Sequence, residues 1–397
     1  MISVSEALDE ILGRATAVGD ELIGTLTARG RVLAATVTAG GPMPPVPRAA
    51  VDGYAVLASD RGARELVGDE LVAGPGAVLA LARGQAVRIM TGADLPDGAD
   101  AVVMVEDSRE QGSRVTFRSP IRVGDNVHAV GVDVRAGDEL VAAGEVLGPA
   151  ELGILAAVGQ TEVRVHRRVR VAVLATGDEL VEPWLDPPRG CIRDSNRYAL
   201  RAAVEDTGAL VTWHGMAPDD ESGLRGAVER ALAECDVLIT SGGVSMGTRD
   251  LMKPLLESLG SVHFGRVNFK PGKPLTFATI GERLVFALPG YPVSSLVTYE
   301  VFVRPALMKL QGMAVWHRPV VSVTLGHDVK PDHSRPEYQR ATISVASGAL
   351  VAKTTGSQGS SRLLSMRGAN ALLRLEPGVA TLPAGSSVAA LLTGPVC

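Results

Sequence analysis

The feature that most constrains the fold is an alternation of apolar runs with helical periodicity over residues 168 to about 310. Runs such as residues 169–175 and 237–240 are short and mostly apolar, as in buried parallel strands. Segments with helical spacing separate them, and Asp220 is placed to cap one that extends to Glu234. The pattern predicts a doubly wound α/β domain, in which ligands bind beyond the carboxyl ends of the strands.

Residues 236–250 (DVLITSGGVSMGTRD) form the most informative strand end. A buried strand runs into a loop of glycines and hydroxyls, and such glycines let backbone N–H groups approach an anion closely. Asp250 at the edge of the loop would repel that anion unless a hard cation lies between them. The alternative is an ordinary strand-to-helix turn, in which the glycines only allow the backbone conformation of the turn and bind no ligand. The loop residues available to a ligand are Ser241, Gly242, Gly243, Ser245 and Gly247.

Acidic side chains recur at predicted turns. Those that follow strands of the α/β domain would converge on the carboxyl edge of its sheet. Magnesium needs only one or two carboxylates there, because substrate phosphates complete its coordination. For each residue taken singly the alternative is structural, since aspartate also caps helices and shapes turns. The acidic residues are Asp52, Asp178, Glu179, Asp219, Asp220 and Asp250.

Lys270 and Lys273 lie in a stiff loop, KPGKP, whose prolines hold the chain open. The chain has 33 arginines but only six lysines, so two lysines in one loop stand out. Lysine acts as a movable point charge and suits an oxyanion. Ser294 and Ser295 begin a predicted helix whose N–H groups and dipole also favour anions. A basic hairpin end and an ordinary helix cap are the alternatives at these two places.

The rest of the chain predicts smaller domains. Ser3 and Glu6 form a capping box before a helix that ends at Gly13, and a second short helix is expected before Gly30 and on to Val37. About six short β runs between residues 55 and 130 predict a small β-barrel or sandwich, and β runs after residue 316 predict another small barrel. The expected domains are residues 1–39 with 134–167 (helical and extended), 40–133 (inserted, β), 168–315 (α/β) and 316–397 (C-terminal β-barrel).

Composition and charge argue against several classes of protein. The 397 residues carry a net charge of −5, which disfavours nucleic acid and anionic membranes as partners. No signal peptide or long apolar run is expected, and the cysteines have no C-x-x-C spacing, which suits a reducing cytoplasm. No hydrolase triad or zinc spacing is present in the sequence. These observations predict a cytoplasmic protein with a magnesium-dependent site for a phosphorylated, polyanionic small molecule.

Seven short segments extend over nearly the whole chain: residues 51–56 (VDGYAV), 88–93 (RIMTGA) with 98–100 (GAD), 131–134 (GVDV), 175–180 (ATGDEL), 241–247 (SGGVSMG), 270–274 (KPGKP) and 289–294 (PGYPVS). In this order they resemble the molybdopterin molybdenumtransferase family, which includes bacterial MoeA and the gephyrin E domain. The resemblance implies transfer of molybdenum from molybdate, a co-substrate, to the dithiolene of adenylylated molybdopterin. It also implies magnesium-dependent release of AMP, the last step of molybdenum cofactor biosynthesis.

The same resemblance implies an elongated homodimer of four-part subunits, and a molybdopterin adenylyltransferase is a candidate partner. It places three acidic residues near the magnesium and the pyrophosphate: Glu179, Asp219 and Asp250. It assigns molybdate and phosphate to Lys270, Lys273, Ser294 and Arg340. Pro289 and Pro292 would shape their loop. It implies that the cleft is completed from the partner subunit by Asp52, Thr91 and Asp133.

Two positions depart from the family pattern. Tyr291 stands where the family's Pro-Gly-Asn-Pro has asparagine, and Arg266 stands where a lysine often occurs. Arginine keeps the charge but changes the geometry, so both departures concern substrate positioning rather than the reaction. Two other functions are considered. The first is a non-catalytic relative that binds the cofactor or serves as a scaffold, and the retained acidic residues count against it. The second is adenylyl transfer to the pterin, and the extra β domains count against it.

Overall fold

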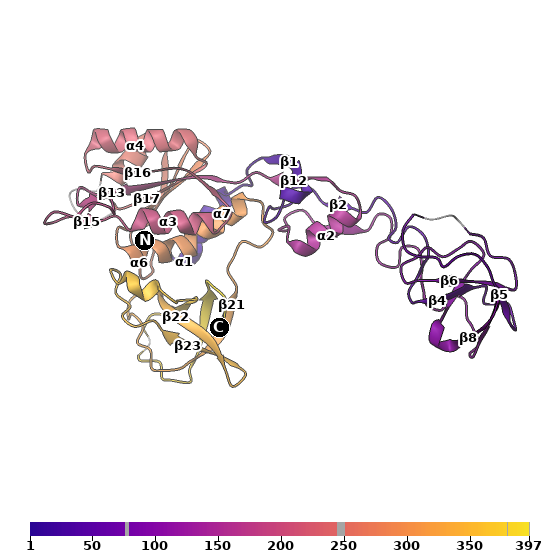
Figure 1. The fold of residues 1–397 in the computed structure, drawn as a ribbon. Coiled ribbons are helices and arrows are strands. Elements are labelled where there is room, and N and C mark those ends of the chain that lie inside the picture. Colours follow the sequence, from indigo (N-terminus) through magenta and orange to yellow (C-terminus); the bar gives the residue numbers. More distant parts are fainter. Residues whose placement is uncertain (76–78, 244–250, 379, 397) are drawn as a thin grey trace. The chain divides into compact units, whose positions relative to one another are not determined.

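The computed structural model describes residues 1–75, 79–243, 251–378 and 380–396. The chain divides into two compact units (Figure 1). The first comprises Met1–Ala35, Ala143–Gly148 and Glu162–Cys397, and the second comprises Thr36–Ala142 and Pro149–Thr161. The four domain boundaries expected from the sequence stay predictions, and each unit is described by itself.

A six-stranded sheet forms the centre of the first unit. Its strand order is β16-β13-β17-β20-β19-β18. The first four strands pair in parallel, and β19 runs antiparallel to both of its neighbours. Strands β19 and β20 form a hairpin. The strands are β13 (Arg170–Thr176), β16 (Leu210–Ala217), β17 (Val237–Ser241), β18 (Ser261–Phe264), β19 (Thr276–Ile280) and β20 (Arg283–Leu288).

Helices cover both faces of this sheet. In β13, Val171 and Val173 join one hydrophobic core, with residues of α1, α3, α6 and α7, whereas Ala172 and Leu174 join a second core with α4 and α5. Apolar residues on both faces are what a buried parallel strand requires. The prediction of a doubly wound α/β fold is confirmed, and Figure 1 shows α4 and α3 on opposite sides of the strands. The helices after β13 are α3 (Asn196–Glu205), α4 (Glu221–Glu234), α5 (Met252–Leu259), α6 (Pro292–Thr298), the π-helical η3 (Tyr299–Val303) and α7 (Arg304–Leu310).

The first helix is α1 (Val4–Arg14), and its predicted capping box is confirmed. Glu6 N donates to Ser3 Oγ at 3.2 Å, and Ser3 N donates to Glu6 Oε2 at 2.7 Å. The second helix expected before Gly30 is wrong. The chain there forms β1 (Asp20–Gly24), which pairs with β12 (Glu162–His166), and a 3-10 turn η1 (Thr25–Thr27). A strand partner far along the chain outweighs the local helical preference.

The C-terminal strands form a closed barrel in the order β21-β23-β22-β24-β25, which confirms the small β-barrel. Val323, Ile343 and Leu373 lie in its core. Strand β22 reaches the α/β domain, because Glu337 forms an isolated bridge with Lys270. The elements are β21 (Val320–Leu325), β22 (Glu337–Ala346), β23 (Ala349–Thr354), η4 (Leu363–Met366), β24 (Ala371–Leu375) and β25 (Ser387–Leu392).

The second unit holds another six-stranded sheet, in the order β7-β4-β6-β5-β9-β8, which confirms a small β fold here. Tyr54 and Ala55 on β4 contribute to two different cores, so both faces are covered. The sheet comprises β4 (Gly53–Val56), β5 (Arg64–Leu66), β6 (Gln85–Ile89), β7 (Ala101–Met104), β8 (Ser108–Gln111) and β9 (Arg114–Phe117). The unit also holds β2 (Val37–Thr38), β3 (Arg48–Ala49), η2 (Val105–Asp107), β10 (Val127–His128), β11 (Glu139–Val141) and α2 (Pro149–Ala157).

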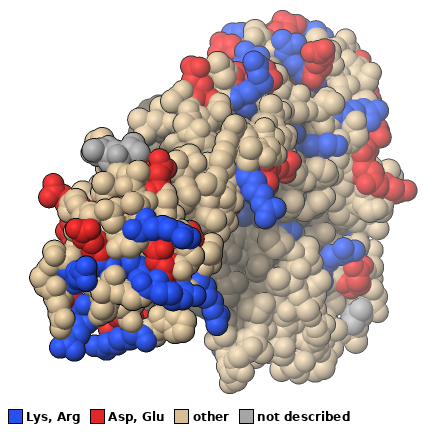
Figure 2. Space-filling view, turned by 90° about the vertical axis from the view of Figure 1, so that its right-hand side faces the viewer, with Lys and Arg blue, Asp and Glu red and all other residues tan. Residues whose placement is uncertain are grey.

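The surface reflects the near balance of charges in the composition. On the face that Figure 2 shows, lysine and arginine side chains lie among aspartate and glutamate side chains. The net charge of −5 is therefore not gathered into a single-sign field on this face. Among the helices of the described ranges, none has the length and apolar character needed to cross a membrane.

Candidate active site

Three parallel strands end side by side and their following turns line one cleft of about 640 Å³. Strands β13, β17 and β20 end at Thr176, Ser241 and Leu288, which are register partners or neighbours in the sheet. The turn after β16 adds Asp219 to the same wall. This is the carboxyl edge on which ligand-binding residues were expected to converge. The predicted site residues on the wall are Glu179, Asp219, Ser241, Gly242, Gly243, Pro289 and Pro292.

The turn after β17 requires glycine at two successive positions. Gly242 and Gly243 have φ angles of 98° and 66°, a region that residues with a side chain rarely adopt. A Cβ atom on Gly242 would lie 2.3 Å from the carbonyl oxygen of Thr176. The two glycines therefore keep the backbone close to the end of β13 and leave the cleft open. The predicted roles of Ser245, Gly247 and Asp250 fall outside the described residues and stay predictions.

Three carboxylates line the cleft. Asp194 is paired with Arg197, which leaves those of Glu179 and Asp219. Neither side chain has a hydrogen bond or ion pair with another residue of the described ranges. Asp178 Oδ1 accepts a hydrogen bond from Asp219 N at 3.0 Å and fixes the backbone that carries Asp219. Asp220 differs, because its Oδ1 accepts from Gly223 N at 2.8 Å and caps α4. That hydrogen bond is the main reason why the pKa of Asp220 lies below its ordinary value.

The carboxylates fit a hydrated magnesium ion that also binds a phosphate. Within the described residues, no group of three or more histidine, cysteine, aspartate or glutamate side chains is placed to hold a metal. Magnesium usually keeps several waters and uses one or two carboxylates plus substrate phosphates. Glu179 and Asp219 match that limited donor set and do not match an all-protein cage.

Asn196, the first residue of α3, ties two walls of the cleft together. Its Nδ2 donates to Ser241 Oγ at 2.7 Å and to the carbonyl oxygen of Gly290 at 2.6 Å. In the sequence, Asn196 is not distinguished from an ordinary residue at the start of a helix. The structure instead gives Asn196 the role of joining the end of β17 to the turn after β20.

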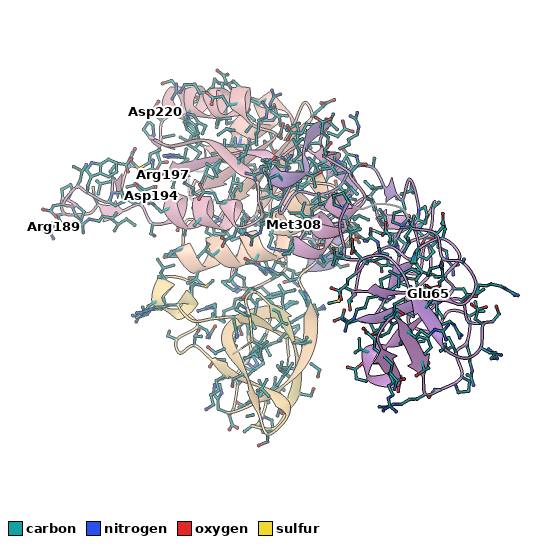
Figure 3. All side chains as sticks on the ribbon, turned by 45° about the vertical axis from the view of Figure 1, so that its right-hand side comes forward. Glu65, Arg189, Asp194, Arg197, Asp220 and Met308 are labelled. Atoms are coloured by element: carbon teal, nitrogen blue, oxygen red, sulfur yellow. The ribbon has the colours of Figure 1, made fainter. Side chains whose placement is uncertain are left out.

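A salt-bridge network holds the segment that leads into α3. This segment runs from β14 (Leu180–Val181) to β15 (Ile192–Arg193) and carries Arg189 at its projecting end (Figure 3). The buried Arg197 donates from Nε to Asp194 Oδ2 at 2.9 Å and from Nη2 to Glu182 Oε2 at 2.5 Å. Because Asp194 also lines the cleft, this network fixes the cleft wall as well as the base of the projecting segment.

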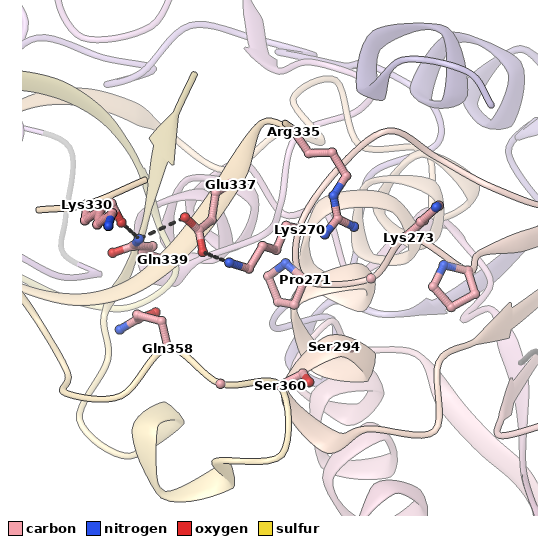
Figure 4. A pocket seen from close by; sticks show the side chains of 13 residues that line it. Lys270, Pro271, Lys273, Ser294, Lys330, Arg335, Glu337, Gln339, Gln358 and Ser360 are labelled. Carbon is pink, nitrogen blue, oxygen red and sulfur yellow. Dashed lines mark hydrogen bonds and ion pairs between the residues drawn. The ribbon is translucent and has the colours of Figure 1, made fainter. Parts of the chain in front are cut away.

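A second pocket, of about 620 Å³, adjoins the cleft and shares Pro274 with it (Figure 4). Lys270 Nζ lies 3.0 Å from Glu337 Oε1 and 3.3 Å from Asp332 Oδ2. Lys273 has no such partner among the described residues, so its ammonium group is available to a ligand. The four cations of the pocket (Lys270, Lys273, Lys330 and Arg335) outnumber Glu337 and Asp332 and leave a net charge of +2. This pocket is called the basic pocket below.

Ser294 of α6 is buried and lines the basic pocket, and its contact with an oxyanion stays a prediction. On the other side of the same helix start, Pro289 and Pro292 line the cleft and flank Tyr291, which is 63% exposed at its rim. Of the two departures from the family pattern, Tyr291 thus lies on the cleft. Arg266 is an exposed residue whose carbonyl oxygen accepts from Ile2 N at 3.3 Å.

Arg340 lies behind the basic pocket rather than on its wall. It is 1% exposed and donates to Ser357 O at 3.2 Å, Gly359 O at 3.4 Å and Ser365 Oγ at 3.0 Å. Burial lowers its pKa to about 10, so the side chain remains charged at neutral pH. Its contacts hold the loop whose Gln358, Gly359 and Ser360 line the basic pocket. A direct contact between Arg340 and substrate stays a prediction.

In the second unit, the structure brings Asp52, Thr91 and Asp133 near one pocket of about 560 Å³. Thr91 and Asp133 line that pocket together with Arg48 and His128. Thr91 donates from both its backbone N and its Oγ1 to Asp52 Oδ1 at 2.7 Å. The backbone hydrogen bond is the main cause of the lowered pKa of Asp52. Asp52 and Thr91 are therefore joined by hydrogen bonds, and Asp133 lines the same pocket as Thr91. The predicted role of the three residues in completing the cleft from the partner subunit stays a prediction.

A largely parallel sheet with a glycine turn, two carboxylates without a partner among the described residues and an adjoining basic pocket defines an α/β ligand-binding domain. Residues 172–309, which contain the sheet, match the family model described as "Probable molybdopterin binding domain". Residues 2–159 match the MoeA N-terminal region (domain I and II), and residues 322–393 match the MoeA C-terminal region (domain IV).

Relatives and solved structures cover the same three regions together. The molybdopterin molybdenumtransferase of Haemophilus influenzae is 35% identical over 87% of this chain and 87% of its own. That of Nostoc sp. is 38% identical over 86% of this chain and 82% of its own. A Dictyostelium discoideum gephyrin is 37% identical over 89% of this chain, which spans 57% of gephyrin. A moeA protein of Pyrococcus horikosii covers both chains fully with a TM-score of 0.86 at 30% identity. The chain belongs to the molybdopterin molybdenumtransferase family.

Proposed function

We propose that this protein transfers molybdenum from molybdate to the dithiolene of adenylylated molybdopterin, with magnesium-dependent release of AMP. The observation that carries the proposal is the pair of adjoining pockets in the first unit. One pocket has an excess of cations, and the other has a glycine turn and two unpaired carboxylates. Molybdate and a pyrophosphate repel each other, so each needs its own binding pocket. The two pockets must also be adjacent for the reaction, and they meet at Pro274.

The basic pocket is the proposed molybdate site. Its net charge of +2 matches a tetrahedral dianion, and the unpaired Lys273 supplies the ammonium that is free to approach it. Glu337 is 2% exposed and holds Lys270 through an ion pair. Lys270 is therefore a fixed positive charge on the wall, whereas Lys273 is a movable one.

The cleft is the proposed site of the pterin and its pyrophosphate. N–H groups of the turn at Gly242 and Gly243 would bind phosphate oxygens, which is a common use of glycine turns after parallel strands. Glu179 and Asp219 would hold magnesium against the same phosphates. The chemistry that magnesium supplies when bound is neutralisation of charge where AMP leaves. Asn196 would hold the two walls of the cleft in fixed positions relative to each other.

A homodimer, a cytoplasmic location and docking of an adenylyltransferase belong to the same proposal, because the family resemblance implies them. A measured mass in solution tests the first. A mass equal to two chains is expected, and a monomer at micromolar concentration would contradict the proposed dimer.

The reaction is tested by incubating the purified protein with adenylylated molybdopterin, molybdate and magnesium, while both AMP and molybdenum-loaded pterin are measured. Both products should form faster than without protein. A non-catalytic binder is the competing function, and it would retain the pterin without forming either product. That result would overturn the proposed transfer and leave the binding site in place.

A further inference from the structure

A second set of cations lies at the amino edge of the parallel sheet, opposite the edge that bears the cleft. It lines a pocket of about 560 Å³ formed by Glu21, Arg31, Arg167, Arg168, Arg170 and Leu210. Arg170 and Leu210 begin β13 and β16, whereas the cleft lies where these strands end. All six residues belong to the first unit. The proposed transfer reaction uses none of them. This pocket is called the arginine pocket below.

One carboxylate holds two of the arginines in place. Arg167 donates from Nη1 to Asp236 Oδ2 at 2.7 Å and from Nη2 to Oδ1 at 3.0 Å, and Arg170 Nη2 donates to Oδ1 at 3.0 Å. Burial would raise the pKa of Asp236, but these hydrogen bonds outweigh it and lower the pKa to about 2. Asp236 is therefore ionised at neutral pH. Two guanidinium groups that are already ordered lose less freedom when a ligand binds.

The other two arginines differ in how far they are neutralised. Arg31 Nη2 donates to Glu21 Oε1 at 2.5 Å and to the carbonyl oxygen of His166 at 2.8 Å. Arg168 is exposed, and its side chain has no hydrogen bond or ion pair with another residue of the described ranges. Among the described residues, the ion pairs of the four guanidinium groups are to the carboxylates of Glu21 and Asp236, so these six side chains carry a net charge of +2.

We propose that the arginine pocket binds a dianion of the phosphate type, with Arg168 as the group that closes on it. The planar guanidinium fork matches two phosphate oxygens at once, a geometry that an ammonium group does not offer. The local charge of +2 matches a phosphate dianion at neutral pH. The volume exceeds that of one phosphate group, and the exposed Leu210 on the wall can contact an organic portion. Free phosphate and the phosphate of a nucleotide share this chemistry.

The test is protection of individual arginines from phenylglyoxal, mapped by mass spectrometry on the unmodified full chain. Inorganic phosphate is added in one arm, AMP in a second, and chloride at the same ionic strength in a third. At a ligand concentration about ten times the dissociation constant, mass action leaves roughly one-tenth of the sites free, so modification of Arg168 should slow about tenfold. Protection by AMP alone would identify a nucleotide as the ligand, and equal protection by phosphate would identify the phosphate group as sufficient.

Arg164 is the matched control, because it is an exposed arginine on β12 that pairs with Asp20 and does not line the pocket. Its modification should not change in any arm. The proposal is overturned if Arg168 is protected no more than Arg164, which is the behaviour of an ordinary solvated arginine surface. A second measurement uses Arg168→Gln, in which phosphate should protect Arg170 less than in the original protein. Unchanged protection of Arg170 would also overturn the assigned role of Arg168. Because the readout is specific to each residue, anion binding in the basic pocket does not affect it.

Discussion

Asn196 donates a hydrogen bond from Nδ2 to Ser241 Oγ at 2.7 Å, although 45 positions separate the two residues in the chain. The same Nδ2 donates to Gly290 O at 2.6 Å. One amide therefore joins three elements: the start of α3, the end of β17 and the turn after β20. We expect this junction to set the width of the cleft.

Asn196→Asp should lower the rate of molybdenum transfer more than Asn196→Ala. The aspartate side chain has no N–H donor, and its negative carboxylate would face and repel the carbonyl oxygen of Gly290. Alanine only removes the two hydrogen bonds. Each of the two hydrogen bonds of Asn196 contributes about 0.5–1.5 kcal/mol, so their loss in the alanine variant should slow the rate by about tenfold. The rate is measured with circular dichroism of each variant as the folding control. A fully active aspartate variant would show that the junction does not position the cleft.

Lys273→Ala should raise the molybdate concentration needed for half-maximal rate by roughly tenfold or more, since a hydrogen bond to a charged group contributes about 1.5–3 kcal/mol. The matched control is Lys353→Ala, which removes an exposed lysine of β23 outside both pockets. Initial rates are measured against molybdate at fixed pterin. If both variants respond alike, the basic pocket is not the molybdate site.

Glu179→Gln and Asp219→Asn should each increase the magnesium concentration needed for AMP release, and removal of magnesium with a chelator should stop it. Both substitutions remove a negative oxygen from the proposed coordination while keeping the side-chain size. Asp220→Asn is the control, because asparagine also caps helices well and Asp220 does not line the cleft. A magnesium dependence that is the same in all three variants would remove Glu179 and Asp219 from the metal site.

Asp236→Asn should lower the melting temperature at neutral pH. The ionised carboxylate is favoured in the folded chain, where its pKa is about 2 instead of the ordinary 3.8. Its stabilisation is therefore fully present above about pH 4 and is lost as the pH falls through 2. Melting curves of the two proteins should converge over that interval. Asp186→Asn, which removes a fully exposed partner of Arg193, should change little.

The predicted site residues that line the cleft are those whose position follows from a strand end. Ser241, Gly242 and Glu179 lie at or within three residues of the ends of buried parallel strands, and such ends meet at one edge of a sheet whatever the detailed packing. Asn196 was missed because its partners depend on the three-dimensional positions of β17 and the turn at Gly290. A helix start shows only a capping residue in the sequence.

Arg340 shows a second reason why sequence alone does not place a side chain. Its family position predicts a cation near the oxyanion, yet sequence gives no measure of burial. In the structure, β22 places its side chain beneath the loop that ends at Ser361, where it binds the carbonyl oxygens of Ser357 and Gly359. The helix expected before Gly30 was wrong for a related reason, since β1 exists through its pairing with β12, more than a hundred residues later.

The most direct test of the account is a single-turnover experiment with protein and magnesium in excess over adenylylated molybdopterin, started by adding molybdate. AMP and molybdenum-loaded pterin should appear together, in equal amounts and at the same rate, and Lys273→Ala should slow both. Release of AMP with no molybdenum on the pterin, or no AMP at all, would contradict it.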